Sequence, residues 1–380
     1  MTAYFDPDAC DLAQFKALTS QTLDAIQVPL AAEIQKNVPI YDMATLSEHL
    51  ENPKLRRILM AEWAQGLRHG AGIVVLKNAY ADCAPIDAAT QVYNDVIAAE
   101  KLADAGGADH FAAAGNNDRV WNSLQKLCLR DPATFAAYFA NPAIDAVCEA
   151  WLGPNYQMTA QVNLVRPGGG AQLAHRDYHL GFQTAGTSAQ YPAHVHDLSP
   201  VLTLQGAVAH SDMPVQSGPT KLLPFSQAYA AGYAAWRRDD FRAYFEESYV
   251  QLPLSKGDAL FFSPALFHGA GANTSKDVHR MANLLQVSSA FGRAMESIDR
   301  AAMCKAVYAE MTKFQGARRH AAIAACAEGY AFPTNLDRDP PVGGLAPQSQ
   351  AALFHAALEA GWSAAEFAEA LDAQTARRRA

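Results

Sequence analysis

The sequence predicts an α+β protein in which a mainly β core, residues 155–292, is flanked by helices at both ends. Residues before 155 are rich in alanine at helical spacing, and helical spacing returns after residue 293. Between them, alternating apolar and polar runs are separated by glycine and proline turns. Such short strands are typical of a sandwich or barrel rather than a parallel α/β sheet. We expect segments at 1–154, 155–292 and 293–380, integrated into one domain.

The first segment is expected to be mostly helical, with one clear strand. Residues 48–68 place apolar side chains at helical spacing, and the glycine-rich residues 70–72 end that helix. The following run, residues 73–76, is β-branched and apolar, which indicates a buried strand. Further helices are expected downstream, with boundaries at Pro132 and Pro142.

The middle segment is expected to supply most strands of the core. The predicted strands and extended runs are residues 158–166, 172–177, 201–210, 259–262 and 281–289. The turns between them include Pro167 to Gly170 and Ser217 to Thr220.

The third segment is expected to be helical, with an irregular surface stretch at residues 335–341, where two prolines follow a charged run. Ser363 and Glu366 have the S-x-x-E spacing of a helix capping box. The arginines at 377–379 suit the negative end of the helix that follows this box.

Composition argues against several functional classes. A net charge of −8 in 380 residues does not suit a general nucleic-acid or membrane-surface binder. No apolar run approaches the roughly 18 to 20 residues of a membrane span, and the N-terminus does not resemble a secretory signal. The six cysteines include no C-x-x-C pair, which indicates structural thiols in a reducing compartment. We therefore expect a cytoplasmic protein without nucleic-acid or membrane partners.

Three short motifs place a carboxylate two residues after a histidine. They are His49-Leu50-Glu51, His175-Arg176-Asp177 and His210-Ser211-Asp212. The first lies in a predicted helix, where positions i and i+2 point about 200° apart and cannot chelate one ion. On a strand, positions i and i+2 share a face, so the second and third motifs both qualify.

Residues further along the chain favour the motif at His175. His268 follows a predicted apolar strand, and a second histidine completes the two-histidine, one-carboxylate set that holds non-haem Fe(II) in oxygenases. Arg280 enters the next predicted strand. Its guanidinium, which is always charged, can hold a carboxylate in a bidentate fork, as a dicarboxylate co-substrate would require.

Several motifs between residues 155 and 292 occur in an order shared with a known enzyme family. They are Arg166-Pro167-Gly168, His175-Arg176-Asp177, Ser217-Gly218-Pro219-Thr220 with Pro224, His268-Gly269, Asn273 and Arg280. In this order they resemble the phytanoyl-CoA dioxygenase-like family of Fe(II)- and 2-oxoglutarate-dependent oxygenases. Weaker similarity extends over residues 55–80. The resemblance implies a double-stranded β-helix core, the jelly-roll or cupin-like architecture.

The resemblance also implies roles for individual residues. His175, Asp177 and His268 would ligate iron, and Arg280 would bind the distal carboxylate of 2-oxoglutarate. O2 is the other co-substrate, and succinate and CO2 are released as a small-molecule substrate is hydroxylated. The carboxylate of Asp177 favours hydroxylation, because halogenating relatives generally have a small residue there. His210 falls away from the iron in this alignment, in a place that is either structural or next to the metal ligands.

Other polar residues could belong to the ligand site or could be structural. Gln161 and Asn163 share one face of a predicted strand. They could bind the co-substrate or the substrate, or they could be ordinary polar residues on the face of a sheet. Residues 117–121 combine polar and aromatic side chains that could line a substrate pocket. The pair His194 and His196 is expected to be solvent-exposed in a loop.

Arg237, Arg238 and Arg242 are interleaved with Asp239 and Asp240. They are expected to form a solvated helix face rather than a site for a phosphate-bearing substrate such as a CoA ester.

Two other functions remain open. One is a cupin-type metal enzyme that does not use 2-oxoglutarate, and the other is a non-catalytic binding protein on the same fold. The sequence identifies neither the primary substrate nor the oligomeric state.

Overall fold

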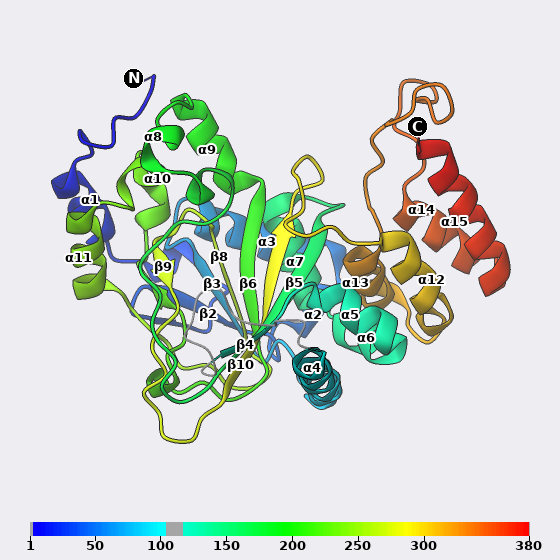
Figure 1. Ribbon diagram of the computed structural model, residues 1–380, viewed down its shortest axis with the longest axis horizontal. Coiled ribbons are helices and arrows are strands. Elements are labelled where there is room, and N and C mark those ends of the chain that lie inside the picture. Colours follow the sequence, from blue (N-terminus) through cyan, green and yellow to red (C-terminus); the bar gives the residue numbers. More distant parts are fainter. Residues whose placement is uncertain (1–2, 104–116, 380) are drawn as a thin grey trace.

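The computed structural model describes residues 3–103 and 117–379 (Figure 1). Its strands are β1 (Glu33–Gln35), β2 (Val38–Asp42), β3 (Ile73–Lys77), β4 (Asn117–Val120), β5 (Gln157–Val165), β6 (Thr203–Ala209), β7 (Lys221–Leu222), β8 (Ala259–Phe262), β9 (His268–Gly269) and β10 (Arg280–Ser288). Its α-helices are α1 (Leu12–Thr19), α2 (Ser47–Glu51), α3 (Pro53–Arg68), α4 (Ala84–Leu102), α5 (Ser123–Arg130), α6 (Pro132–Phe139), α7 (Pro142–Leu152), α8 (Ala185–Ser188), α9 (Ala193–Val201), α10 (Gly232–Ala235), α11 (Asp239–Ser248), α12 (Arg300–Met311), α13 (Gly316–Cys326), α14 (Gln350–Glu359) and α15 (Ala364–Arg378).

One large sheet organises the described part of the chain. Its eight strands have the order β1-β2-β3-β8-β6-β10-β5-β4, and all neighbours are antiparallel except β2 and β3. β7 and β9 form a separate two-stranded sheet. Helices α1 and α8 to α11 gather at one end of the long axis, and α12 to α15 lie at the other (Figure 1). The large, mostly antiparallel sheet confirms the prediction of a β core that is not a parallel α/β sheet, with helices before and after it in the sequence.

The two faces of the sheet have different neighbours. Because side chains alternate along a strand, Met158, Ala160 and Val162 of β5 point into a core shared with α3, α5 to α7, α12 and α13. Gln161 and Asn163 of the same strand point the other way, into a cavity. The sheet therefore buries an apolar face against helices and offers a partly polar face to a ligand.

The first segment contributes more strands than expected. β3 confirms the predicted strand at residues 73–76, but β1, β2 and β4 were not predicted. β1 and β4 are three and four residues long and mostly polar, so they carry no clear period-two signal. The division into segments at 1–154, 155–292 and 293–380 stays a prediction.

Local signals placed several helix boundaries. The predicted helix over residues 48–68 is split at Asn52, whose side chain accepts hydrogen bonds from the backbone of Lys54 and Leu55, with Pro53 in the first turn. The capping box at Ser363 and Glu366 is confirmed at the start of α15. Within residues 3–103 and 117–379, none of the helices combines the length and apolar character that a bilayer crossing requires.

His210 links the sheet to the helices that cover it. Its Nδ1 lies 2.8 Å from the Thr90 hydroxyl of α4, and its Nε2 lies 2.8 Å from the Tyr138 hydroxyl of α6. A neutral imidazole satisfies both contacts, as donor at one nitrogen and acceptor at the other. Burial lowers the pKa of His210 to about 3. The structural interpretation of the His210 motif is therefore confirmed, and its ring lies in the helix-covered core.

This burial predicts a pH dependence of stability. The folded state keeps His210 neutral, whereas the unfolded chain binds a proton below its ordinary pKa of about 6.5. The free energy of unfolding should therefore fall as the pH drops from about 6.5 towards 3, by up to about 1.4 kcal/mol per pH unit from this one residue. Denaturant titrations of the native protein and His210→Gln between pH 8 and 5 test this. The variant should show the shallower pH profile, and parallel profiles would contradict the assignment.

Candidate metal centre and its cavity

His175 and His268 lie directly opposite each other on antiparallel segments. The backbone nitrogen of His175 donates to the carbonyl oxygen of His268 at 2.9 Å, and His268 donates back to His175 at 3.2 Å. Residues paired in this way hold their side chains on the same face, and the two ring centroids are 4.4 Å apart. The predicted extended run at residues 172–177 is thus realised as an isolated bridge rather than a regular strand.

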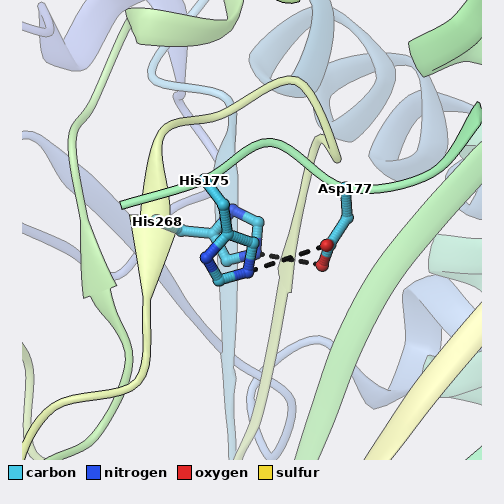
Figure 2. A group of neighbouring side chains, drawn as sticks. All are labelled: His175, Asp177 and His268. Carbon is cyan, nitrogen blue, oxygen red and sulfur yellow. Dashed lines mark ion pairs between the residues drawn. The ribbon is translucent and has the colours of Figure 1, made fainter. Parts of the chain in front are cut away.

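Asp177 completes a three-residue group. It lies two positions beyond His175, so the extended backbone turns its side chain to the same side. The Nε2 atoms of His175 and His268 lie 3.6 and 3.3 Å from the two carboxylate oxygens of Asp177 (Figure 2). One ligand atom from each residue can be chosen so that all lie within 4.8 Å of one another, which fits a single metal ion.

Backbone carbonyls fix the orientation of both imidazoles. The Nδ1 atom of His175 lies 2.8 Å from the carbonyl oxygen of Leu173, and that of His268 lies 2.8 Å from the carbonyl oxygen of Leu266. A carbonyl oxygen only accepts, so each Nδ1 carries the proton and donates it. Each Nε2 is left to face Asp177 as the ligand atom.

The charges of the group also suit metal binding. Burial alone would raise the pKa of Asp177, but His175 and His268 outweigh it and hold that pKa well below its usual range. Burial, followed by the charge of His175, lowers the pKa of His268. Burial would also lower the pKa of His175, but the Asp177 carboxylate raises it overall, so a proton competes with a metal there.

Arg176, between the ligands, anchors the segment from behind. Its side chain is buried, and its Nη2 donates to the carbonyl oxygens of Ser226 and Tyr229 at 2.6 and 3.0 Å. Its guanidinium also lies over the rings of Tyr233 and Phe267. These contacts hold the backbone that presents His175 and Asp177, a role that the sequence did not indicate.

Gln205 of β6 supports Asp177 directly. Its side-chain amide donates to a carboxylate oxygen of Asp177. Hydrogen-bond partners of metal ligands orient them and tune their affinity. Gln205 was not predicted to act at the site, although it is the one polar side chain in the otherwise apolar run Leu204 to Ala209.

A cavity of about 790 Å³ opens over this group. Its lining includes every residue predicted to act at the site: His175, Asp177, His268, Arg280, Asn163 and Gln161. Arg119 and Trp121 also line it, which confirms that residues 117–121 reach the cavity.

Arg280, the first residue of β10, is buried in the cavity wall. Only 7% of it is exposed, and its Nη1 donates to the carbonyl oxygens of Ser217 and Gly271 at 3.0 and 3.3 Å. Within the described chain no carboxylate pairs with it, and burial lowers its pKa to about 10. A buried guanidinium without a counter-charge is costly, so this position favours an anionic ligand.

Gln161 and Asn163 differ in how many of their side-chain amide atoms already form hydrogen bonds. The Gln161 amide donates to Gln286 at 3.0 Å and accepts from Arg119 at 3.2 Å. The Oδ1 atom of Asn163 is buried and has no hydrogen-bond partner among the described residues. Asn163 is therefore the more available of the two for a bound molecule.

Two expectations about polar residues are confirmed only in part, since His194 and Arg237 are exposed as expected but their neighbours are not. His194 and His196 lie on helix α9 rather than in a loop, and His196 is buried with its Nε2 3.0 Å from the Ser188 carbonyl oxygen. Arg237 and the half-buried Arg242 also line the cavity, which the sequence did not indicate. Arg238 is half-buried and pairs with Asp240.

The close packing behind the centre gives a prediction. A Cβ atom at Gly232 would lie 1.9 Å from the guanidinium carbon of Arg176. Gly232→Ala should displace that side chain, cost about 1–3 kcal/mol of stability and weaken metal binding. Gly186→Ala is the matched control, since nothing lies within 4 Å of its added Cβ. Thermal unfolding and Fe(II) titration test both variants, and a Gly232 variant as stable as the control would contradict the packing.

Two known dioxygenases are similar in sequence to part of this chain. The chain is 28% identical over 147 residues to dioxygenase andF of Emericella variicolor, covering 37% of this chain and 45% of that protein. It is 28% identical over 193 residues to dioxygenase aneA of Aspergillus aculeatus, covering 48% and 57%. The chain thus spans about half the length of these relatives.

Among solved structures, the chain is similar to the non-haem α-ketoglutarate-dependent carbocyclase SnoK from nogalamycin biosynthesis, at 19% identity and a TM-score of 0.40. That match covers 65% of this chain and 88% of SnoK.

A sequence model of a protein family gives the broadest match. The model described as phytanoyl-CoA dioxygenase (PhyH) matches residues 68–282, which is more than half of the chain and includes His175, Asp177, His268 and Arg280. This family implies Fe(II) as the metal, with 2-oxoglutarate and O2 as co-substrates. The chain belongs to the phytanoyl-CoA dioxygenase family.

Proposed function

We propose that this protein is an Fe(II)- and 2-oxoglutarate-dependent dioxygenase that hydroxylates a small molecule and releases succinate and CO2. The observation that carries the proposal is Arg280, a buried guanidinium without a carboxylate partner in the described chain, in the same cavity as His175, Asp177 and His268. A metal triad alone suits many metal enzymes. A triad beside a buried cationic site suits a metal enzyme with an anionic co-substrate.

The residues fit the metal. His175 and His268 would each offer Nε2, and Asp177 would offer one carboxylate oxygen, the facial triad of non-haem Fe(II) oxygenases. Bound there, Fe(II) would supply the activation of O2 that couples decarboxylation of 2-oxoglutarate to oxidation of the substrate. Gln205 would hold Asp177 in position through its hydrogen bond.

The cavity fits the co-substrate. Arg280 would bind the distal carboxylate of 2-oxoglutarate, because a guanidinium forms paired, charge-assisted hydrogen bonds with a carboxylate. Asn163 would contribute the N–H groups of its side-chain amide from the neighbouring strand, where it lies opposite Ala282 in the register. Gln161, already bonded at both ends of its amide, would act mainly by holding Arg119 at the cavity wall.

Finer features belong to the same proposal. The small β7-β9 sheet carries His268, and the large sheet carries Arg280, an arrangement that supports a double-stranded β-helix core. The carboxylate of Asp177 supports hydroxylation as the outcome. A cytoplasmic location stays a prediction.

The metal and co-substrate are tested by anaerobic titration. The protein with Fe(II) and 2-oxoglutarate should develop a visible metal-to-ligand charge-transfer band. Asp177→Ala should abolish it, because the triad loses its carboxylate. Asp212→Ala is the control, since it removes the carboxylate of the other strand motif, which accepts from the Lys256 backbone instead.

Arg280→Ala separates this function from its alternatives. It should leave Fe(II) binding intact but weaken 2-oxoglutarate binding by about 30-fold or more, because losing one side of a buried charge pair costs about 2–5 kcal/mol. Unchanged 2-oxoglutarate affinity in this variant would favour a cupin-type enzyme without that co-substrate. Absence of the charge-transfer band in well-folded native protein would contradict the proposed dioxygenase function.

A further inference from the structure

Besides Arg280, a pair of neighbouring arginines lines the cavity from other elements of the fold. Arg237 follows α10, and Arg242 lies in the first turns of α11. Both guanidiniums lie over the indole ring of Trp236, at 3.9 and 5.3 Å from its centre. Trp236 is buried and lines the same cavity, so it holds the two charged groups near each other at the cavity wall.

Neither arginine forms an ion pair within the part of the chain that the structure describes. The Nε atom of Arg242 is buried with no hydrogen-bond partner there, and Arg237 donates only to the backbone carbonyls of Gly181 and Gln183. Burial and then the charge of Arg242 lower the pKa of Arg237, as expected of two nearby cations.

The surrounding charges make this pair unusual. Arg238, between them in sequence, is bonded to Asp240 and to the backbone of residues 7–10, and it does not line the cavity. Among the described residues, the cavity lining contains five arginines and a single carboxylate, that of Asp177. Asp177 is assigned to the metal and Arg280 to the co-substrate, so no carboxylate of the described lining is left to balance the positive charge of Arg237 and Arg242.

We propose that Arg237 and Arg242 form a subsite for an anionic group, a carboxylate or a phosphate ester, on the primary substrate. An anion placed between two guanidiniums accepts several charge-assisted hydrogen bonds and removes their mutual repulsion. Phe182, a largely exposed aromatic side chain in the same lining, offers an apolar contact for the body of such a molecule. This inference rests on the proposed function, because it names the substrate class of that site.

Calorimetry with three probes of similar shape tests the subsite: phenylacetate, phenyl phosphate and the neutral phenylacetamide. Each is titrated into protein carrying Fe(II) and saturating 2-oxoglutarate without O2, and into protein without them. At least one anion should bind more tightly than the amide in both forms. The tighter of the two anions identifies the group as carboxylate or phosphate.

Variants locate the binding. Arg242→Gln should weaken binding of the preferred anion by about tenfold or more, the usual effect of losing one charge-assisted hydrogen-bonding group. Arg242→Lys should lose less, because it keeps the charge. Arg238→Gln, with the same change in net charge outside the cavity, should bind like the native protein. Thermal unfolding of each variant confirms that the fold is kept.

Two results would overturn the subsite. One is equal binding of the anions and the amide. The other is loss of anion binding in Arg280→Ala rather than Arg242→Gln, which would place the probes at the co-substrate position. The charge-transfer band of Arg242→Gln with 2-oxoglutarate should match that of the native protein. A missing band in the native protein would remove the dioxygenase assignment, while the probe titrations would still decide the anion subsite.

Discussion

The pairing of His175 with His268 is the constraint on which the site depends. Two reciprocal backbone hydrogen bonds join these residues across antiparallel segments that are far apart in sequence. That pairing sets both imidazoles on one face, and the extended backbone brings Asp177 to the same face two residues later. A slip of one residue in this register would turn one histidine away from the cavity.

The rest of the fold protects this register. Arg176 ties the segment to the backbone of residues 226–229, and Gln205 reaches from β6 to hold the carboxylate. Burying a guanidinium such as Arg176 is costly, and it is offset by two carbonyl acceptors and two aromatic rings. Helices cover the other face of the sheet, where His210 forms hydrogen bonds to α4 and α6. This packing supports the strands that line the cavity.

Much of the fold and the centre could be predicted because the signals are local. The i, i+2 spacing of His175 and Asp177 predicts a shared face, and the long strands β5, β8 and β10 were predicted within a residue or two. The residue that pairs with His175 could not be predicted from local signals. Spacing alone does not say which distant histidine will pair with it, so His268 and Arg280 depended on the order of motifs shared with a family.

The residues that were missed act through tertiary contacts. Arg176 lies between two ligands in the sequence, but nothing in the sequence identifies the backbone carbonyls to which it donates. The cavity position of Arg237 and Arg242 was missed because the adjacent aspartates suggest a purely solvated face, whereas Asp240 pairs with Arg238. His196 was misread because Pro192 and Pro200 suggest a loop, yet Pro192 precedes helix α9 and Pro200 falls in its last turn.

The central claim is that one metal ion binds between His175, His268 and Asp177. The most direct test is a crystal structure of the protein with Fe(II) under anaerobic conditions, with the metal located by its anomalous scattering. We predict a single iron bonded to the Nε2 atoms of His175 and His268 and to one carboxylate oxygen of Asp177. Iron at another position, or bound through an Nδ1 atom, would contradict this account.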